Sequence, residues 1–141
     1  MFEDAVRILE HHTANVHHLD RTLFVHLLGT YNLLKSRNKP EHICLAGLFH
    51  SIYETEYFEF ATPFTRQQIK TLIGEQAESI VYEFCNTVPR TTNLLERHGD
   101  WSDQMYADLL DVDIAQMVEQ GYYNDTIKTM EAIRKYLVIR D

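Results

Sequence analysis

A histidine lies in one of the most apolar stretches of the chain, Gly47-Leu48-Phe49-His50-Ser51-Ile52. At 100° per residue the apolar side chains of this stretch point in all directions, which predicts a central, buried helix that begins near Pro40. A buried imidazole needs a hydrogen-bonding partner or a metal ion, because an unpaired polar group inside a protein is costly. His50 is therefore the first candidate for a functional side chain.

Two further polar side chains face the apolar side of a predicted helix. His26 falls among leucines on the wheel of its helix, and Asp113 falls among apolar residues on a late helix. Asp108 and Asp111, on the same late helix, point nearly the opposite way and are expected to be solvated. A buried carboxylate is destabilising unless it is paired. We therefore expect His26, His50 and Asp113 to meet, either as a hydrogen-bonded triad or around a shared metal ion.

This order of residues resembles the HD-domain superfamily of metal-dependent phosphohydrolases, in which a histidine is followed by a His-Asp pair and a late aspartate. His26 matches the first histidine, His50 the second and Asp113 the final aspartate. Ser51 stands where the signature aspartate is expected. The Gly-Leu-Phe-His-Ser string is similar to an uncharacterised HD-like family that carries serine at this place. The resemblance is strongest over residues 18–87 and implies an all-α, HD-like bundle.

The resemblance leaves two histidines and one carboxylate, His26, His50 and Asp113, as metal ligands. This is the ligand set of a facial triad for non-haem iron, and manganese or zinc are alternatives. Such a mononuclear site is expected to act on a small-molecule substrate by hydrolysis or oxygenation. The alternative is an HD-like module that kept the fold, lost the metal and binds a small ligand or a partner without catalysis. Ordinary HD phosphohydrolysis is disfavoured by Ser51.

Other side chains are candidates for catalysis or for the walls of a substrate pocket. Glu54 is expected one helical turn from His50 as an acid or base, although a carboxylate facing water is the alternative. Tyr53 is the second catalytic candidate, and the aromatic segment 53–64 is expected to cover the site as a lid. The candidates for the substrate pocket are His18, Thr30, Tyr31 and Tyr57.

The composition favours one compact helical domain over residues 1–141, because 45% of the residues are hydrophobic and only 5 are Gly and 3 Pro. A formal charge of −8 argues against nucleic acid as a partner. The sequence shows neither a transmembrane-length apolar run nor a signal peptide, so a cytoplasmic location without a membrane partner is expected. Cys44 and Cys85 are expected to be buried thiols.

Start and stop signals divide the chain into six or seven helices, with no strands. An amphipathic helix is expected over about residues 2–12. Thr65 with Gln68 predicts a capping box, and Ser102 predicts the cap of the helix that carries Asp113. The stretch from Pro89 to Trp101 is expected to be a loop. Together these signals predict an all-α bundle in which three separate helices position the polar residues.

Overall fold

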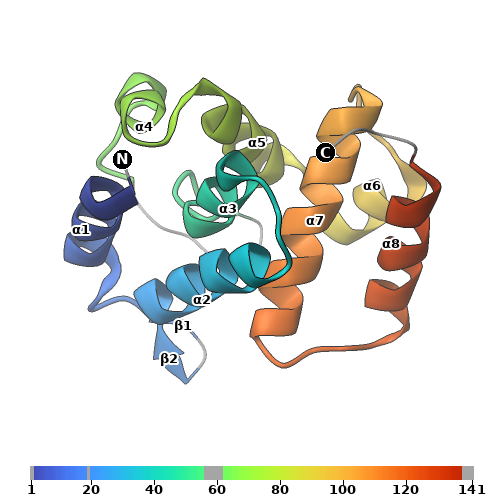
Figure 1. Cartoon of the computed structure of the whole chain (residues 1–141), viewed down its shortest axis with the longest axis horizontal. Helices are drawn as coiled ribbons and strands as arrows, with labels where there is room; N and C mark the ends of the chain where they lie inside the picture. Colours follow the sequence, from blue (N-terminus) through green and yellow to red (C-terminus); the bar gives the residue numbers. More distant parts are fainter. Residues whose placement is uncertain (1, 19, 56–61, 138–141) are drawn as a thin grey trace.

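The computed structural model describes residues 2–18, 20–55 and 62–137 (Figure 1). In this part of the chain the elements are α1 Phe2–Thr13, β1 His17–His18, β2 Arg21–Thr22, α2 Leu23–Ser36, α3 Glu41–Leu48, α4 Arg66–Ile73, α5 Glu75–Asn86, α6 Arg90–Glu96, α7 Asp103–Glu119 and α8 Asp125–Tyr136. The all-α prediction is confirmed, with eight helices in the described part where the sequence indicated six or seven.

Two local predictions were wrong. The stretch after Pro89 forms helix α6 and not a loop, since Pro89 serves as the N-cap residue of that helix. The prediction of no strands also fails, because β1 and β2 form a two-residue antiparallel ladder in which His17 pairs with Thr22. This hairpin delivers the chain directly to α2, whose first turn is capped by the Thr22 hydroxyl accepting from the Val25 amide.

The predicted helix starts at Thr65 and Ser102 are confirmed. Thr65 and Gln68 form the reciprocal capping box at the start of α4. The Ser102 hydroxyl accepts a hydrogen bond from the Met105 amide at the start of α7. These caps satisfy amide groups that have no partner within the first turn of a helix, so they fix where α4 and α7 begin.

Helix α7 runs through the middle of the molecule, with α2, α3 and α5 against it on one side and α6 and α8 on the other (Figure 1). All of its residues from 106 to 116 are buried. The prediction that Asp108 and Asp111 are solvated was therefore wrong. Asp111 forms ion pairs with Arg134 of α8 at 3.0 Å and with Lys39 at 3.3 Å. Asp108 accepts a hydrogen bond from Gln104 at 2.9 Å.

Helices α2 and α3 approach each other closely at Gly47. A Cβ atom added there would lie 2.5 Å from Cδ1 of Leu34 and 3.2 Å from Cγ2 of Thr30. The expectation of a close helix contact on this face is confirmed, and it explains why a residue with low helix propensity lies in the last turn of α3.

Helix α3 ends earlier than the sequence indicated. Its last residue is Leu48, and Phe49 leaves the helical backbone conformation as the C-cap residue. His50 and Ser51 therefore lie in the turn that follows, and both are buried. Glu54 adopts a left-handed conformation with φ of 72° and is exposed, so it does not lie one helical turn from His50 as predicted.

Candidate functional site

A cavity of about 360 Å³ lies between α2, the turn after α3, the start of α6 and the end of α7. Most of the residues that line it have polar side chains. Their side chains fall into histidines, hydroxyls, amides and one ion pair: His18, His26 and His50; Ser51, Thr55 and Thr91; Gln116, Gln120 and Asn124; Arg90 with Asp113. Tyr122 and Asn124 are exposed and mark the mouth. A cavity of this size is within the range that holds a small molecule.

The three histidines of the cavity form one group. The rings of His18 and His26 are stacked with centroids 4.8 Å apart, and the ring of His50 stands perpendicular to that of His26 at 5.0 Å. His26 and His50 are almost completely buried, at 1% and 3% exposure. The expected convergence of these two residues is therefore found in the fold.

The turn after α3 holds His50 as a neutral imidazole. Its Nδ1 lies 2.7 Å from the carbonyl oxygen of Gly47, which can only accept a hydrogen bond, so Nδ1 carries the proton and Nε2 is an acceptor. Burial, followed by the proximity of His26, lowers the pKa of His50 well below its ordinary value. The thiol of Cys85 donates to the backbone carbonyl of His50 at 3.2 Å and fixes the turn from the other side.

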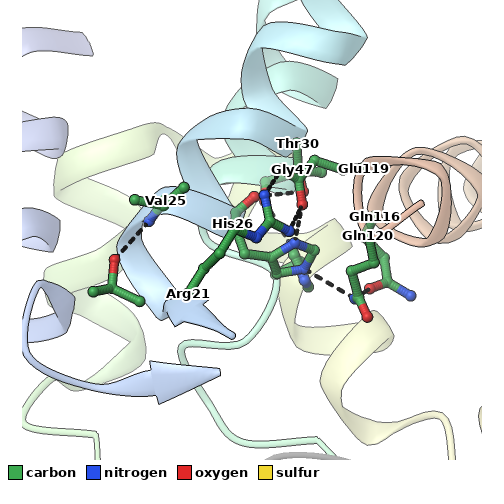
Figure 2. A network of polar contacts seen from close by, with 10 residues as sticks. Arg21, Val25, His26, Thr30, Gly47, Gln116, Glu119 and Gln120 are labelled. Atoms are coloured by element: carbon green, nitrogen blue, oxygen red, sulfur yellow. Dashed lines mark hydrogen bonds and ion pairs between the residues drawn. The ribbon is translucent and has the colours of Figure 1, made fainter. Parts of the chain in front are cut away.

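His26 is held by a carboxylate from the end of α7. Its Nδ1 lies 2.5 Å from Oε1 of Glu119, and both terminal nitrogens of Arg21 donate to the two oxygens of Glu119 at 2.6 Å (Figure 2). Burial lowers the pKa of His26 and outweighs the opposing hydrogen bond to Glu119. Burial alone would raise the pKa of Glu119, but the hydrogen bonds from Arg21 and His26 outweigh it and leave that pKa lowered.

Asp113 forms an ion pair with Arg90. Nε of Arg90 lies 3.1 Å from Oδ1 of Asp113, and both side chains are buried. Gln116 donates to the same oxygen at 3.0 Å. The guanidinium of Arg90 also lies over the ring of Phe84, 4.4 Å from its centroid. The positive charge therefore comes from α6, which the sequence had indicated to be a loop.

Two glutamines connect Asp113 to His26 along one face of α7. Gln120 donates to Oε1 of Gln116 at 2.7 Å, and its amide nitrogen lies 3.3 Å from Nε2 of His26 (Figure 2). With the bond from Gln116 to Asp113, the side chains form one continuous polar chain across the cavity. Asp113 and His26 are thus connected through two amide groups, and the predicted direct triad or shared metal ion stays a prediction.

The remaining predicted residues are placed as follows. His18 lines the cavity. The described residues that line the cavity do not include Thr30, Tyr31, Tyr53 or Glu54. The hydroxyl of Thr30 donates to the carbonyl of His26, that of Tyr31 to Glu41, and that of Tyr53 to Glu78. Tyr57 and most of the expected lid lie outside the described residues.

The surroundings of Asp113 do not fit the divalent metal that the HD resemblance implies. Oδ1 of Asp113 already accepts from Arg90 and Gln116, and a guanidinium beside the carboxylate repels a metal ion. Within residues 2–18, 20–55 and 62–137, no group of three His, Cys, Asp or Glu side chains is placed to hold a metal ion. The metal site therefore stays a prediction from the sequence.

A second, larger cavity of about 470 Å³ lies between the first turns of α3, α5 and α7. Its buried carboxyl is Asp108, whose pKa is raised by burial despite the hydrogen bond from Gln104. His42 also lines it. The described walls of this cavity do not bring together several buried histidines and a buried ion pair. The smaller cavity is therefore the better candidate for a functional site.

Sequence reasoning missed several side chains of the site, among them Arg90, Gln116, Glu119 and Gln120. A signal for Glu119 was present in Gly29, in the middle of α2. A Cβ atom at Gly29 would collide with the carboxylate of Glu119. A glycine inside a helix, one turn after an inward histidine, indicates the close approach of another group.

Fold and site together define a helical protein with a buried, histidine-rich polar cavity. The chain belongs to a family described as a domain of unknown function (DUF6817), whose model matches residues 7–90. The match includes His26, His50 and Arg90 and ends before α7. No curated protein and no solved structure matches the chain. Among the described residues, no helix combines the length and the apolar character needed to cross a membrane.

Proposed function

We propose that the cavity binds a small, polar, uncharged molecule and does so without a metal ion. The observation that carries this proposal is the pairing of Asp113 with Arg90 beside two neutral imidazoles. The two charged side chains on its described walls, Arg90 and Asp113, are paired with each other. A wall with balanced charges and many hydrogen-bonding groups favours a neutral ligand over an ion.

The arrangement of hydrogen-bonding groups favours a ligand that carries several donors. The imidazole of His50 is an acceptor at Nε2, because its Nδ1 donates to Gly47. Hydroxyls from Ser51, Thr55 and Thr91 line the same space and can both donate and accept. Hydroxyl-rich or amide-containing molecules, such as sugars and nucleosides, have this character.

The HD-like architecture is part of the proposal. It is supported by the order of the site residues: His26 in α2, His50 directly after α3 and Asp113 in α7 all line one cavity. In this interpretation Arg90 provides the positive charge that a metal ion provides in the HD superfamily. The metal-dependent hydrolase or oxygenase is the rival hypothesis, and it needs Asp113 to leave Arg90.

The binding proposal can be tested by NMR titration with D-ribose and uridine, following the side-chain amides of Gln116 and Gln120. We expect saturable shifts in the wild type. Thr91→Trp should abolish them by filling the cavity, whereas Thr92→Trp, on the exposed neighbouring position of α6, should not.

Elemental analysis of protein purified without chelators, with anaerobic handling, separates the two hypotheses. Stoichiometric iron, manganese or zinc that is lost in Asp113→Asn would overturn the metal-free proposal. The absence of shifts with every neutral probe, in protein that is folded, would overturn the ligand class.

A further inference from the structure

The direction of hydrogen-bond donation along the polar chain across the cavity is set by the charged groups at its two ends. Asp113, paired with Arg90, can only accept hydrogen bonds, so Gln116 must present its amide nitrogen to it. The oxygen of Gln116 then accepts from Gln120, and the second N–H of Gln120 points at Nε2 of His26. Nε2 must therefore carry a lone pair.

The other end of the chain imposes the same protonation on His26. Glu119 is held by two hydrogen bonds from Arg21 and is an acceptor, so Nδ1 of His26 must donate to it. Two independent carboxylates thus fix one tautomer, with the proton on Nδ1. An imidazole in this state, with a carboxylate behind it and Nε2 facing a cavity, has the arrangement of a general base.

Close packing between α2 and the end of α7 accompanies the contact between His26 and Glu119. Gly29 lies one turn after His26 on α2, and a Cβ atom added there would overlap the carboxylate end of the Glu119 side chain, so this carboxylate packs closely against α2. The amide nitrogen of Gln120 lies 3.3 Å from Nε2, which is the distance of a weak hydrogen bond that a bound molecule can replace.

We propose that His26 is a general base that removes a proton from a molecule bound in the cavity, with Glu119 as its positioning residue. An O–H bond of the bound molecule or of a water beside it breaks, its electron pair stays on the oxygen, and the proton forms the Nε2–H bond. The imidazolium is then stabilised by Glu119, and the proton returns to the product or to water at the mouth. This inference rests on the proposed function, since the cavity must admit a ligand.

The tautomer is tested by long-range ¹H–¹⁵N NMR of the histidine side chains in the free protein, which needs no ligand. We expect His26 to carry its proton on Nδ1 in the wild type. Glu119→Leu should abolish this preference, and Glu119→Gln, which retains an acceptor, should largely preserve it. A wild-type His26 protonated on Nε2 would overturn the inference even if ribose or uridine binds.

The base function is tested with p-nitrophenyl acetate and water. Here the water proton passes to Nε2, the water oxygen bonds to the carbonyl carbon, and p-nitrophenolate leaves as acetate forms. We expect His26→Gln to lose about 100-fold in kcat/KM, and the wild-type reaction to be slower in D2O. His98→Gln, at an exposed histidine, is the matched control and should match the wild type. A wild type no faster than His26→Gln overturns the inference.

The role of Glu119 has its own readout. Without this carboxylate the imidazolium loses its stabilising partner, so the pKa of His26 should fall further and the pH–rate profile of Glu119→Leu should move to lower pH. Gly29→Ala should move the profile in the same direction with Glu119 still present. Profiles identical to that of the wild type in both variants would show that Glu119 does not position the base. If ribose and uridine still bind in that case, the proposed function stands and the inference alone fails.

Discussion

Acidification should destabilise this protein in the range where histidines titrate. Burial lowers the pKa of both His50 and His26 in the folded state, while in the unfolded chain each has a pKa near 6.5. The unfolded state therefore binds more protons than the folded state as the pH falls through 6.5. Because stability rises with pH wherever the unfolded state holds more protons, the free energy of unfolding should fall as the pH is lowered.

The size of the loss follows from proton binding to the unfolded chain. At a pH of about 5.5, protonation of a group with a pKa of about 6.5 stabilises the unfolded state by RT ln 11, which is about 1.4 kcal/mol. A fold that keeps only His50 neutral loses about this much between pH ~7.5 and ~5.5. A fold that also keeps His26 neutral loses about twice as much, roughly 2.8 kcal/mol.

Carboxylates act differently and can be separated from this effect. Glu119 and Glu78 have lowered pKa values, so their contributions to stability are lost at lower pH than those of the histidines. Asp108 has a raised pKa, and its protonation favours the folded state in acid, which opposes the histidine effect. Repeating the measurement in Asp108→Asn removes this opposing contribution.

Urea unfolding, followed by circular dichroism at a series of pH values, measures the effect. The slope of the free energy of unfolding against pH, divided by about 1.36 kcal/mol, gives the number of protons taken up on unfolding. His26→Gln should lower that number, and His98→Gln, at an exposed position, should leave the histidine contribution of the site unchanged. A free energy of unfolding that stays constant, or that increases as the pH is lowered from ~7.5 to ~5.5, would refute the neutral state of the histidines and the tautomer argument built on it.

Substitutions at three positions test the packing around the site by thermal and urea unfolding. Gly47→Leu should destabilise by about 1–3 kcal/mol through overpacking against α2, and an unchanged midpoint would show an open face. Asp113→Ala should cost about 3–5 kcal/mol because it strands Arg90, with a smaller loss for Asp113→Asn, and equal losses would contradict the ion pair. Tyr106→Phe should cost about 1–3 kcal/mol, because it leaves a buried carbonyl of α6 without the Tyr106 hydroxyl, and no loss would argue against that bond.

Helical periodicity was enough to find the inward polar residues. His26 and Asp113 were identified because each falls on the apolar face of its own helix, and both are 1% exposed. His50 was found by a different route, as a polar residue within an apolar run, and it is buried although it lies beyond the end of α3. Burial of a residue is a local property of the pattern, so a small error in the helix boundary did not affect it.

The same periodicity failed for the opposite face of α7. A helical wheel assumes that a helix has one face in solvent, but helices pack against α7 on both sides. Asp111 is therefore buried, and Arg134 and Lys39 compensate its charge from α8 and from the residues before α3. These partners are 23 and 72 positions away along the chain, so no local pattern around Asp111 could indicate them.

The partners of the histidines were also beyond local patterns, and this changes the chemistry assigned to them. Taken alone, His26, His50 and Asp113 suggest a metal ion, because a buried carboxylate near two imidazoles needs a positive charge. The fold provides that charge as Arg90, at the start of a helix where the sequence indicated a loop. With Arg90 on Asp113, the carboxylate behind His26 is Glu119, which packs closely against α2 at Gly29. Gly29, in the middle of α2 and one turn after His26, was therefore an indication in the sequence that another group approaches this part of α2 closely.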